Sequence, residues 1–161
     1  MGYDGIVRVV KTEHVSDPST TQLYQLGAKT FKDGNEYCYV HFAKEATTGK
    51  YVVVEPNGTS LSSGYTVTVS NASLNGWLAG VAQNTMTSGG YGFVMTKGVG
   101  LIAVDSGEVS AAPGVDLALG TNGGFVAAGA TFSTAPRFAV TINSFVTTVG
   151  TSKARIFGAI L

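Results

Sequence analysis

Cysteine and charged residues are scarce in this 161-residue chain, and each scarcity removes a class of protein. The single cysteine, Cys38, cannot form an internal disulfide, which excludes a disulfide-stapled secreted module and a metal site built on several cysteines. Charged residues make up 12% of the chain and hydrophobic residues 44%, a composition far from that of disordered proteins. No apolar run reaches the roughly 18 residues that a membrane span requires. We therefore expect a folded domain, synthesised in a reducing cytoplasm, with no membrane partner.

A surplus of either charge is also missing, because ten basic residues balance ten acidic ones. Without a basic field there is no electrostatic reason to expect a nucleic-acid partner. Thirteen of these twenty charges lie in the first 60 residues, which leaves a long Thr-, Ser-, Ala- and Gly-rich remainder. Such a neutral surface is typical of an interface between subunits, but it is also common on small β domains, and both interpretations stay open.

Uninterrupted helical segments are absent from most of the chain. Between Trp77 and Val126 short apolar runs are cut by glycine at nearly regular intervals, which predicts short strands joined by tight turns. One short helix is expected elsewhere, with Asp17 as its cap, Pro18 in its first turn, an end near Tyr24 and Gly27 after it.

Alternating apolar and polar residues predict antiparallel strands along the rest of the chain. In Glu36–Phe42, Tyr37 and Tyr39 share one face with His41, whereas Cys38, Val40 and Phe42 share the other. About nine to eleven such strands at turn spacing are typical of an all-β protein, a compact antiparallel β-barrel or sandwich. The further strands are expected at residues 51–55, 65–70, 91–96, 101–104, 115–119, 125–128, 138–149 and 154–161. We assign residues 1–22 to an extended N-terminal arm and residues 23–161 to a single β domain.

Catalytic and cofactor motifs are missing or fail on physical grounds. Gly98, Gly100 and Ala103 match the spacing of a dinucleotide-binding loop, but that loop needs a helix behind it and the turns that follow leave room only for a strand. Cys38 and His41 stand three apart, so in a strand they point to opposite faces and cannot hold one metal ion. We therefore expect no catalytic residues, no cofactor, no metal and no small-molecule substrate.

Three groups of residues are candidates for binding rather than chemistry. The arm carries apolar residues that suit strand addition to a neighbouring protein, namely Tyr3, Ile6, Val7, Val9 and Val10. The C-terminal segment stays apolar to its end, and Phe157, Ile160 and Leu161 are candidates for self-association. Trp77, next to Asn75-Gly76, is either a core residue or a stacking platform for a carbohydrate.

Two stretches of this sequence resemble small structural proteins that are encoded beside the capsid genes of tailed bacteriophages. The resemblance covers roughly Leu26 to Val126 and rests on turn glycines and apolar strands. The matching segments are Leu26-Gly27, Asp33 to Val40, Ala46 to Gly49, Gly80 to Asn84, Gly89 to Gly98, Ala112-Pro113-Gly114 and Gly123-Gly124. No catalytic residues are carried over from this group.

The resemblance implies a non-enzymatic virion protein that decorates or cements the outside of a phage capsid, with the major capsid protein as its partner and a homotrimer as its form. Its location would then be the capsid surface of the virion. Two alternatives remain: a carbohydrate- or receptor-binding module of a tail fibre or spike, which Trp77 would serve, and a tail or connector component.

Overall fold

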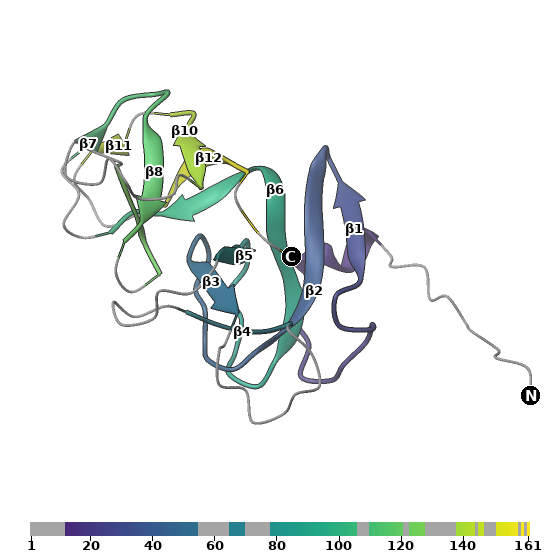
Figure 1. Ribbon diagram of the computed structural model, residues 1–161. Helices are drawn as coiled ribbons and strands as arrows, with labels where there is room; N and C mark the ends of the chain where they lie inside the picture. Colours follow the sequence, from purple (N-terminus) through teal and green to yellow (C-terminus); the bar gives the residue numbers. More distant parts are fainter. Residues whose placement is uncertain are drawn as a thin grey trace, which may run out of the picture.

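The chain is built from β-strands in the parts that the structure describes, with one short 3-10 helix. The computed structural model describes residues 12–54, 65–69, 78–105, 110–120, 123–127, 138–143, 145–146, 151–157, 159 and 161. Figure 1 shows the elements in order: η1 (Thr12–Ser16), β1 (Lys29–Lys32), β2 (Asn35–Phe42), β3 (Tyr51–Val54), β4 (Thr66–Val69), β5 (Leu78–Ala82), β6 (Tyr91–Ala103), β7 (Ser110–Ala111), β8 (Asp116–Leu119), β9 (Phe125–Ala127), β10 (Ala139–Thr141), β11 (Phe145–Val146) and β12 (Thr151–Ile156). The all-β prediction is confirmed.

Five strands of the first half of the fold pair to form a closed ring. Its order is β2-β4-β3-β5-β6, and β6 returns to pair with β2. The β2–β4 pair is parallel, whereas the other four pairs are antiparallel. Strand β1 extends this sheet outward from β2 through a two-residue turn, Asp33-Gly34. Both turn residues have positive φ, which is the geometry that Asp-Gly favours in tight hairpins.

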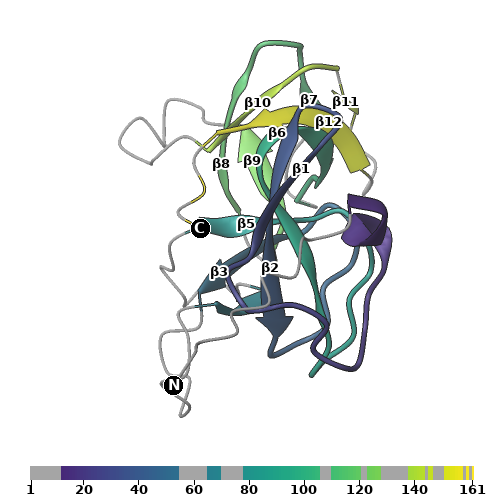
Figure 2. The same ribbon diagram turned by 90° about the vertical axis from the view of Figure 1, so that its right-hand side faces the viewer.

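A second ring is built on the far end of β6. From β6 the pairing runs to β12, β10, β8 and β9, and a parallel bridge between Val104 and Phe125 leads back to the end of β6. The Asp105 amide donates a hydrogen bond of 2.9 Å to the Phe125 carbonyl at this closure. Figure 2 shows the β8, β10 and β12 group above the β2, β3 and β5 group, with β6 common to both.

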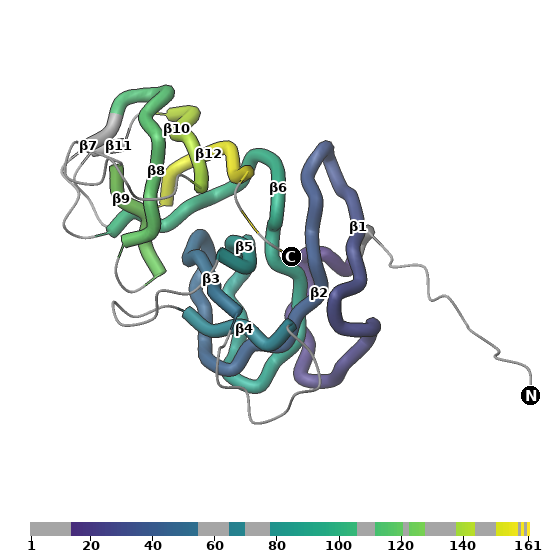
Figure 3. The backbone as a smooth tube through the Cα atoms, in the orientation of Figure 1, coloured from purple at the N-terminus to yellow at the C-terminus, as the bar shows by residue number. Residues whose placement is uncertain are grey.

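The shared strand β6 bends where it passes from one ring to the other. Tyr91 to Lys97 pair with β2, whereas Gly98 to Ala103 pair with β12. Gly98 has a φ of +126°, a conformation that other L-residues rarely adopt. The side chain of Asn35 crosses this bend and accepts a hydrogen bond of 2.8 Å from the Val99 amide. The tube in Figure 3 shows β6 changing direction between the two groups.

Two hydrophobic clusters fill the fold, and strand alternation assigns residues to each. One cluster receives side chains from all five strands of the first ring, including Cys38, Val52, Val67, Ala79 and Val94. The other lies on the opposite face of β2, β3, β5 and β6 and continues into the second ring. It includes the following residues: Tyr37, Tyr39, Tyr51, Phe93, Ile102, Leu117, Phe125 and Ile156. The predicted division of β2 into a Tyr37–Tyr39 face and a Cys38–Val40–Phe42 face is therefore confirmed.

Five expectations from the sequence are wrong in detail. The single strand expected at residues 138–149 is two strands, β10 and β11, in different sheets. The strand expected at residues 154–161 begins at Thr151 and ends at Ile156. The helix expected after Asp17 is absent: the short helix is η1 and ends at Ser16, with the Asp17 amide donating to the His14 carbonyl at 3.1 Å. The two strands expected at residues 91–96 and 101–104 are one continuous strand, β6. The β2–β4 pair is parallel rather than antiparallel, because the chain passes through β3 before β4 joins β2.

The N-terminal segment is described only from residue 12. Within the segment assigned to the arm, Val15 is 5% exposed and belongs to the larger cluster. Ser19 forms an antiparallel bridge with Tyr91. Residues 12–19 therefore pack against the β body, while the boundary between arm and domain stays a prediction.

Candidate interaction site

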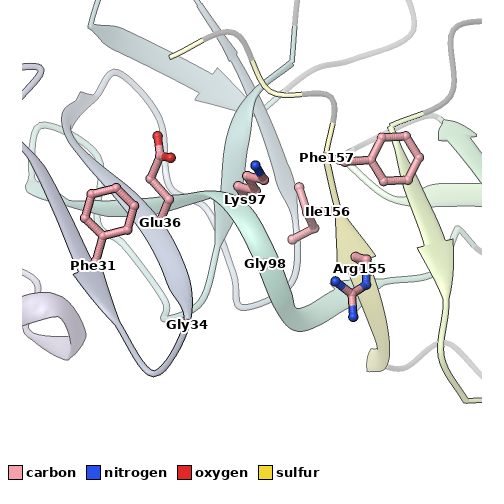
Figure 4. Close-up of a pocket in the computed structure, with 8 residues that line it drawn as sticks. All are labelled: Phe31, Gly34, Glu36, Lys97, Gly98, Arg155, Ile156 and Phe157. Carbon is pink, nitrogen blue, oxygen red and sulfur yellow. The ribbon is translucent and has the colours of Figure 1, made fainter.

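A row of four side chains, three on strands and one directly after a strand, lies at the place where the two rings meet. Phe31 of β1 stands opposite Glu36 of β2, and Glu36 stands opposite Lys97 of β6. Gly98 pairs with Ile156, the last residue of β12, and Phe157 follows directly after it. We call Phe31, Glu36, Lys97 and Phe157 the waist row. Figure 4 shows them in this order, with the two phenylalanines at opposite ends.

The waist row borders a shallow cleft with a volume of about 260 Å³. The cleft is lined by Phe31, Gly34, Glu36, Lys97, Gly98, Arg155, Ile156 and Phe157. Phe31 is 67% exposed and Phe157 48% exposed. Large exposed aromatic side chains in a polar surround are typical of contact surfaces between proteins.

The charges of the waist row are unevenly satisfied within the chain. Lys29 Nζ lies 3.1 Å from Glu36 Oε1, and the Thr96 hydroxyl donates to the same oxygen at 3.3 Å. Lys97 and Arg155, by contrast, form no ion pair with any residue that the structure describes. The row therefore places an anchored carboxylate beside a lysine that is available to a partner.

The scaffold around the waist row is rigid for identifiable reasons. The Asp33-Gly34 turn fixes the β1–β2 register that sets Phe31 opposite Glu36. Asn35 ties this hairpin to the bend of β6 through the Val99 amide. On the other side, the Phe157 amide donates to the Phe138 carbonyl at 3.0 Å, which holds the end of β12. Sites on paired strands are positioned more precisely than sites on loops.

The candidate binding residues from the sequence have different outcomes. Phe157 lies in the waist row, and its role in self-association stays a prediction. Leu161 is partly exposed and packs against the smaller cluster of its own chain. Ile160, Trp77 and the arm residues Tyr3, Ile6, Val7, Val9 and Val10 lie outside the described residues, so their roles stay predictions.

Sequence reasoning missed Phe31, Glu36 and Lys97 as members of one surface. Each belongs to a different strand, and their proximity depends on the order of strands in the sheet. A signal for Phe31 was available: it precedes a hairpin turn with lysines at positions 29 and 32, and a large aromatic side chain there is not needed for the turn.

The residues considered as metal or cofactor ligands lie on the strands and faces that the sequence pattern predicts. Cys38 is fully buried in the smaller cluster, whereas the His41 ring lies 4.9 Å from the Tyr91 ring. Gly98 to Ala103 form the second half of β6, so the expected strand after these glycines is confirmed. Among the described residues no three His, Cys, Asp or Glu side chains gather as metal ligands would. Within the same residues, no helix has the length and apolar character to cross a bilayer.

Burial changes the titration of three groups near the centre of β2. It raises the pKa of the Cys38 thiol from 9.0 to about 11, with a smaller opposing effect of Lys29. It also raises the pKa of the Tyr37 and Tyr39 hydroxyls, against the lowering effect of their hydrogen bonds. All three groups are therefore held neutral, which is the state that a packed interior favours.

This titration predicts a loss of stability in alkali. The unfolded chain releases the Cys38 proton at lower pH than the folded chain does. The contribution of the protonated thiol to folding stability is therefore complete below pH 9 and is lost as the pH rises toward about 11. Urea unfolding at a series of pH values across this range measures the effect. In Cys38→Ala the decline should be shallower and only the tyrosine part should remain; an unchanged decline would contradict the assignment to Cys38.

Comparison with known proteins identifies the fold. No protein-family model matches the chain, and no curated protein matches it either. Among solved structures, the chain is similar to the N base of the head fibre gp8.5 of bacteriophage phi29, with a TM-score of 0.53 and 12% sequence identity. The similarity covers 78% of this chain and 96% of that one. At this identity the likeness shows a shared all-β fold.

Proposed function

We propose that this chain is a non-enzymatic structural protein of a phage virion, located on the outside of the head. The observation that carries the proposal is the fold, which extends over almost the whole of the base of a phage head fibre. Fold alone does not fix function. The waist row supplies a second, independent support, because its exposed aromatic and charged side chains form a surface suited to another protein.

Within that role we propose decoration or cementing of the capsid, with the major capsid protein as partner and a homotrimer as the assembled form. The resemblance in residues 26–126 supports this narrower role. The apolar residues between Tyr3 and Val10 are the proposed capsid contact, because an extended apolar segment can add a strand to a neighbouring sheet. Trimer linkage would multiply the effective concentration of three modest contacts.

Co-sedimentation with purified, undecorated capsid shells tests this proposal. We expect the full chain to sediment with shells, and a chain lacking residues 1–11 to keep its fold but lose most of its binding. The deletion stops before residue 12 because Val15 is part of the core. A matched control replaces exposed Ile142 with alanine and should bind as the full chain does.

Two results would contradict the proposal at different levels. Full binding by the shortened chain would move the capsid contact from the arm to the β body. No binding by the full chain, together with glycan binding that is lost in Trp77→Ala, would instead favour the carbohydrate-binding alternative. Light scattering behind a sizing column measures the assembly, for which we expect three chains or a multiple of three.

A further inference from the structure

The residues of the waist row are arranged so that the row is complementary to a second copy of itself that runs in the opposite direction. It reads aromatic, acidic, basic, aromatic: Phe31 lies on β1, Glu36 on β2, Lys97 on β6, and Phe157 directly after β12. If a second copy is rotated by 180° and laid face to face on the first, Phe31 of each copy meets Phe157 of the other. Glu36 of each copy likewise meets Lys97 of the other. Two-fold contacts between identical chains require this kind of self-complementary patch.

We propose that the waist row is a two-fold interface between two copies of this chain. The axis would lie in the plane of the interface, perpendicular to the row and parallel to the strands. Each contact would then contain two phenylalanine pairs at its ends and two Glu36–Lys97 pairs at its centre. Aromatic pairs of this kind and complementary charges are the features that give protein interfaces affinity and register.

The charges favour a second copy over a partner of one sign. Lys29 is already paired with Glu36 Oε1, so the row offers a second carboxylate oxygen and the Lys97 ammonium group, which a second copy can match with the opposite groups. Both contacts of Glu36 within the chain use Oε1, so Oε2 faces no described partner and suits Lys97 of the second copy.

Arg155 agrees with the same arrangement. On β12 it lies two residues before Phe157 and pairs with Val99. On β1 the corresponding displacement from Phe31 leads to the hairpin turn, where Asp33 is exposed. The rotation therefore brings Arg155 of one copy toward the turn of the other, and the acidic residue exposed there has the opposite charge.

This interface goes beyond the proposed capsid role and does not depend on it. A trimer requires a different surface, since a two-fold patch cannot also supply a three-fold contact. If both exist, the waist row would join trimers in pairs, and on a shell it would link neighbouring trimers. The assembled mass would then be twice that of the species in which the waist row is disabled.

Charge reversal tests the two-fold contact without requiring knowledge of any other partner. Glu36→Lys alone and Lys97→Glu alone should each weaken the association by about 100-fold or more, because every contact contains the repulsion twice. The two single variants mixed together should associate with each other, since one supplies two basic and the other two acidic side chains. The double variant should associate with itself. Sedimentation velocity measures all four samples.

The matched control is Lys153→Glu, which reverses an exposed charge on β12 outside the row and should leave association unchanged. Phe157→Ala gives an independent reading: two truncated anchors per contact should weaken association by about 30-fold. Circular dichroism confirms that each variant is folded. The proposal is overturned if the single reversals leave the mass unchanged, or if the mixed variants fail to associate. Loss of shell binding with an intact two-fold contact would count against the capsid role alone.

Discussion

Replacing Gly98 with alanine is expected to lower the free energy of unfolding by about 3 kcal/mol or more. Gly98 combines a φ of +126° with a crowded surround, because an added Cβ would collide with the Asn35 side chain. Asn35 cannot move aside without giving up its hydrogen bond to the Val99 amide. The variant therefore has to strain the bend of β6 or break the connection that braces it.

A glycine that also has a positive φ, but in open surroundings, provides the control. Gly34 has a φ of +78°, and no heavy atom lies within 4 Å of its added Cβ. Gly34→Ala should cost only about 1 kcal/mol, the conformational part of the penalty. Urea unfolding of both variants measures the difference. Equal costs would contradict the role assigned to the β6 bend.

Phe125→Ala is expected to destabilise the chain by about 3–5 kcal/mol, the range found when a buried phenylalanine is removed from a core. Phe125 is fully buried, and its backbone forms the bridge to Val104 that leads β9 back to β6. Its ring packs edge-on against Tyr51 of the first ring, with centroids 5.5 Å apart. The Tyr51 hydroxyl in turn donates to the Gly120 carbonyl at 2.6 Å. Removing Phe125 thus weakens both the second ring and its contact with the first.

The control for this prediction is Phe31→Ala, which removes an exposed phenylalanine and should change the stability of a single chain by less than about 0.5 kcal/mol. A double-mutant cycle with Tyr51→Leu and Phe125→Leu should show a coupling of about 0.5–1.5 kcal/mol. Thermal or urea unfolding supplies all of these values. Zero coupling would show that the two rings are held together elsewhere.

Local features of the fold could be predicted from the sequence because local physics determines them. Glycine at short intervals excludes long helices, and alternation in residues 36–42 separates Tyr37 and Tyr39 from Cys38, Val40 and Phe42, as found. The Asp33-Gly34 turn is likewise local, because an Asp-Gly pair favours the positive φ angles that both residues adopt. These patterns depend on neighbours within a few residues.

The predictions that were wrong concern features that depend on residues far apart in the chain. Gly98 and Gly100 look like a break between two strands, but pairing with β2 on one side and β12 on the other keeps β6 continuous. The expected cap at Asp17 did not start a helix because Ser19 pairs with Tyr91 instead. The waist row unites residues 31, 36, 97 and 157, so no local pattern could have revealed it.

The location of the chain in a virion tests the account most directly. Electron cryo-microscopy of particles from the phage that encodes it should show, on the outer surface of the head, density that fits two strand rings joined by β6. Particles lacking the chain should lack that density, and restoring the protein should restore it. Density confined to the tail or connector, or absence of the chain from purified particles, would contradict the proposed function.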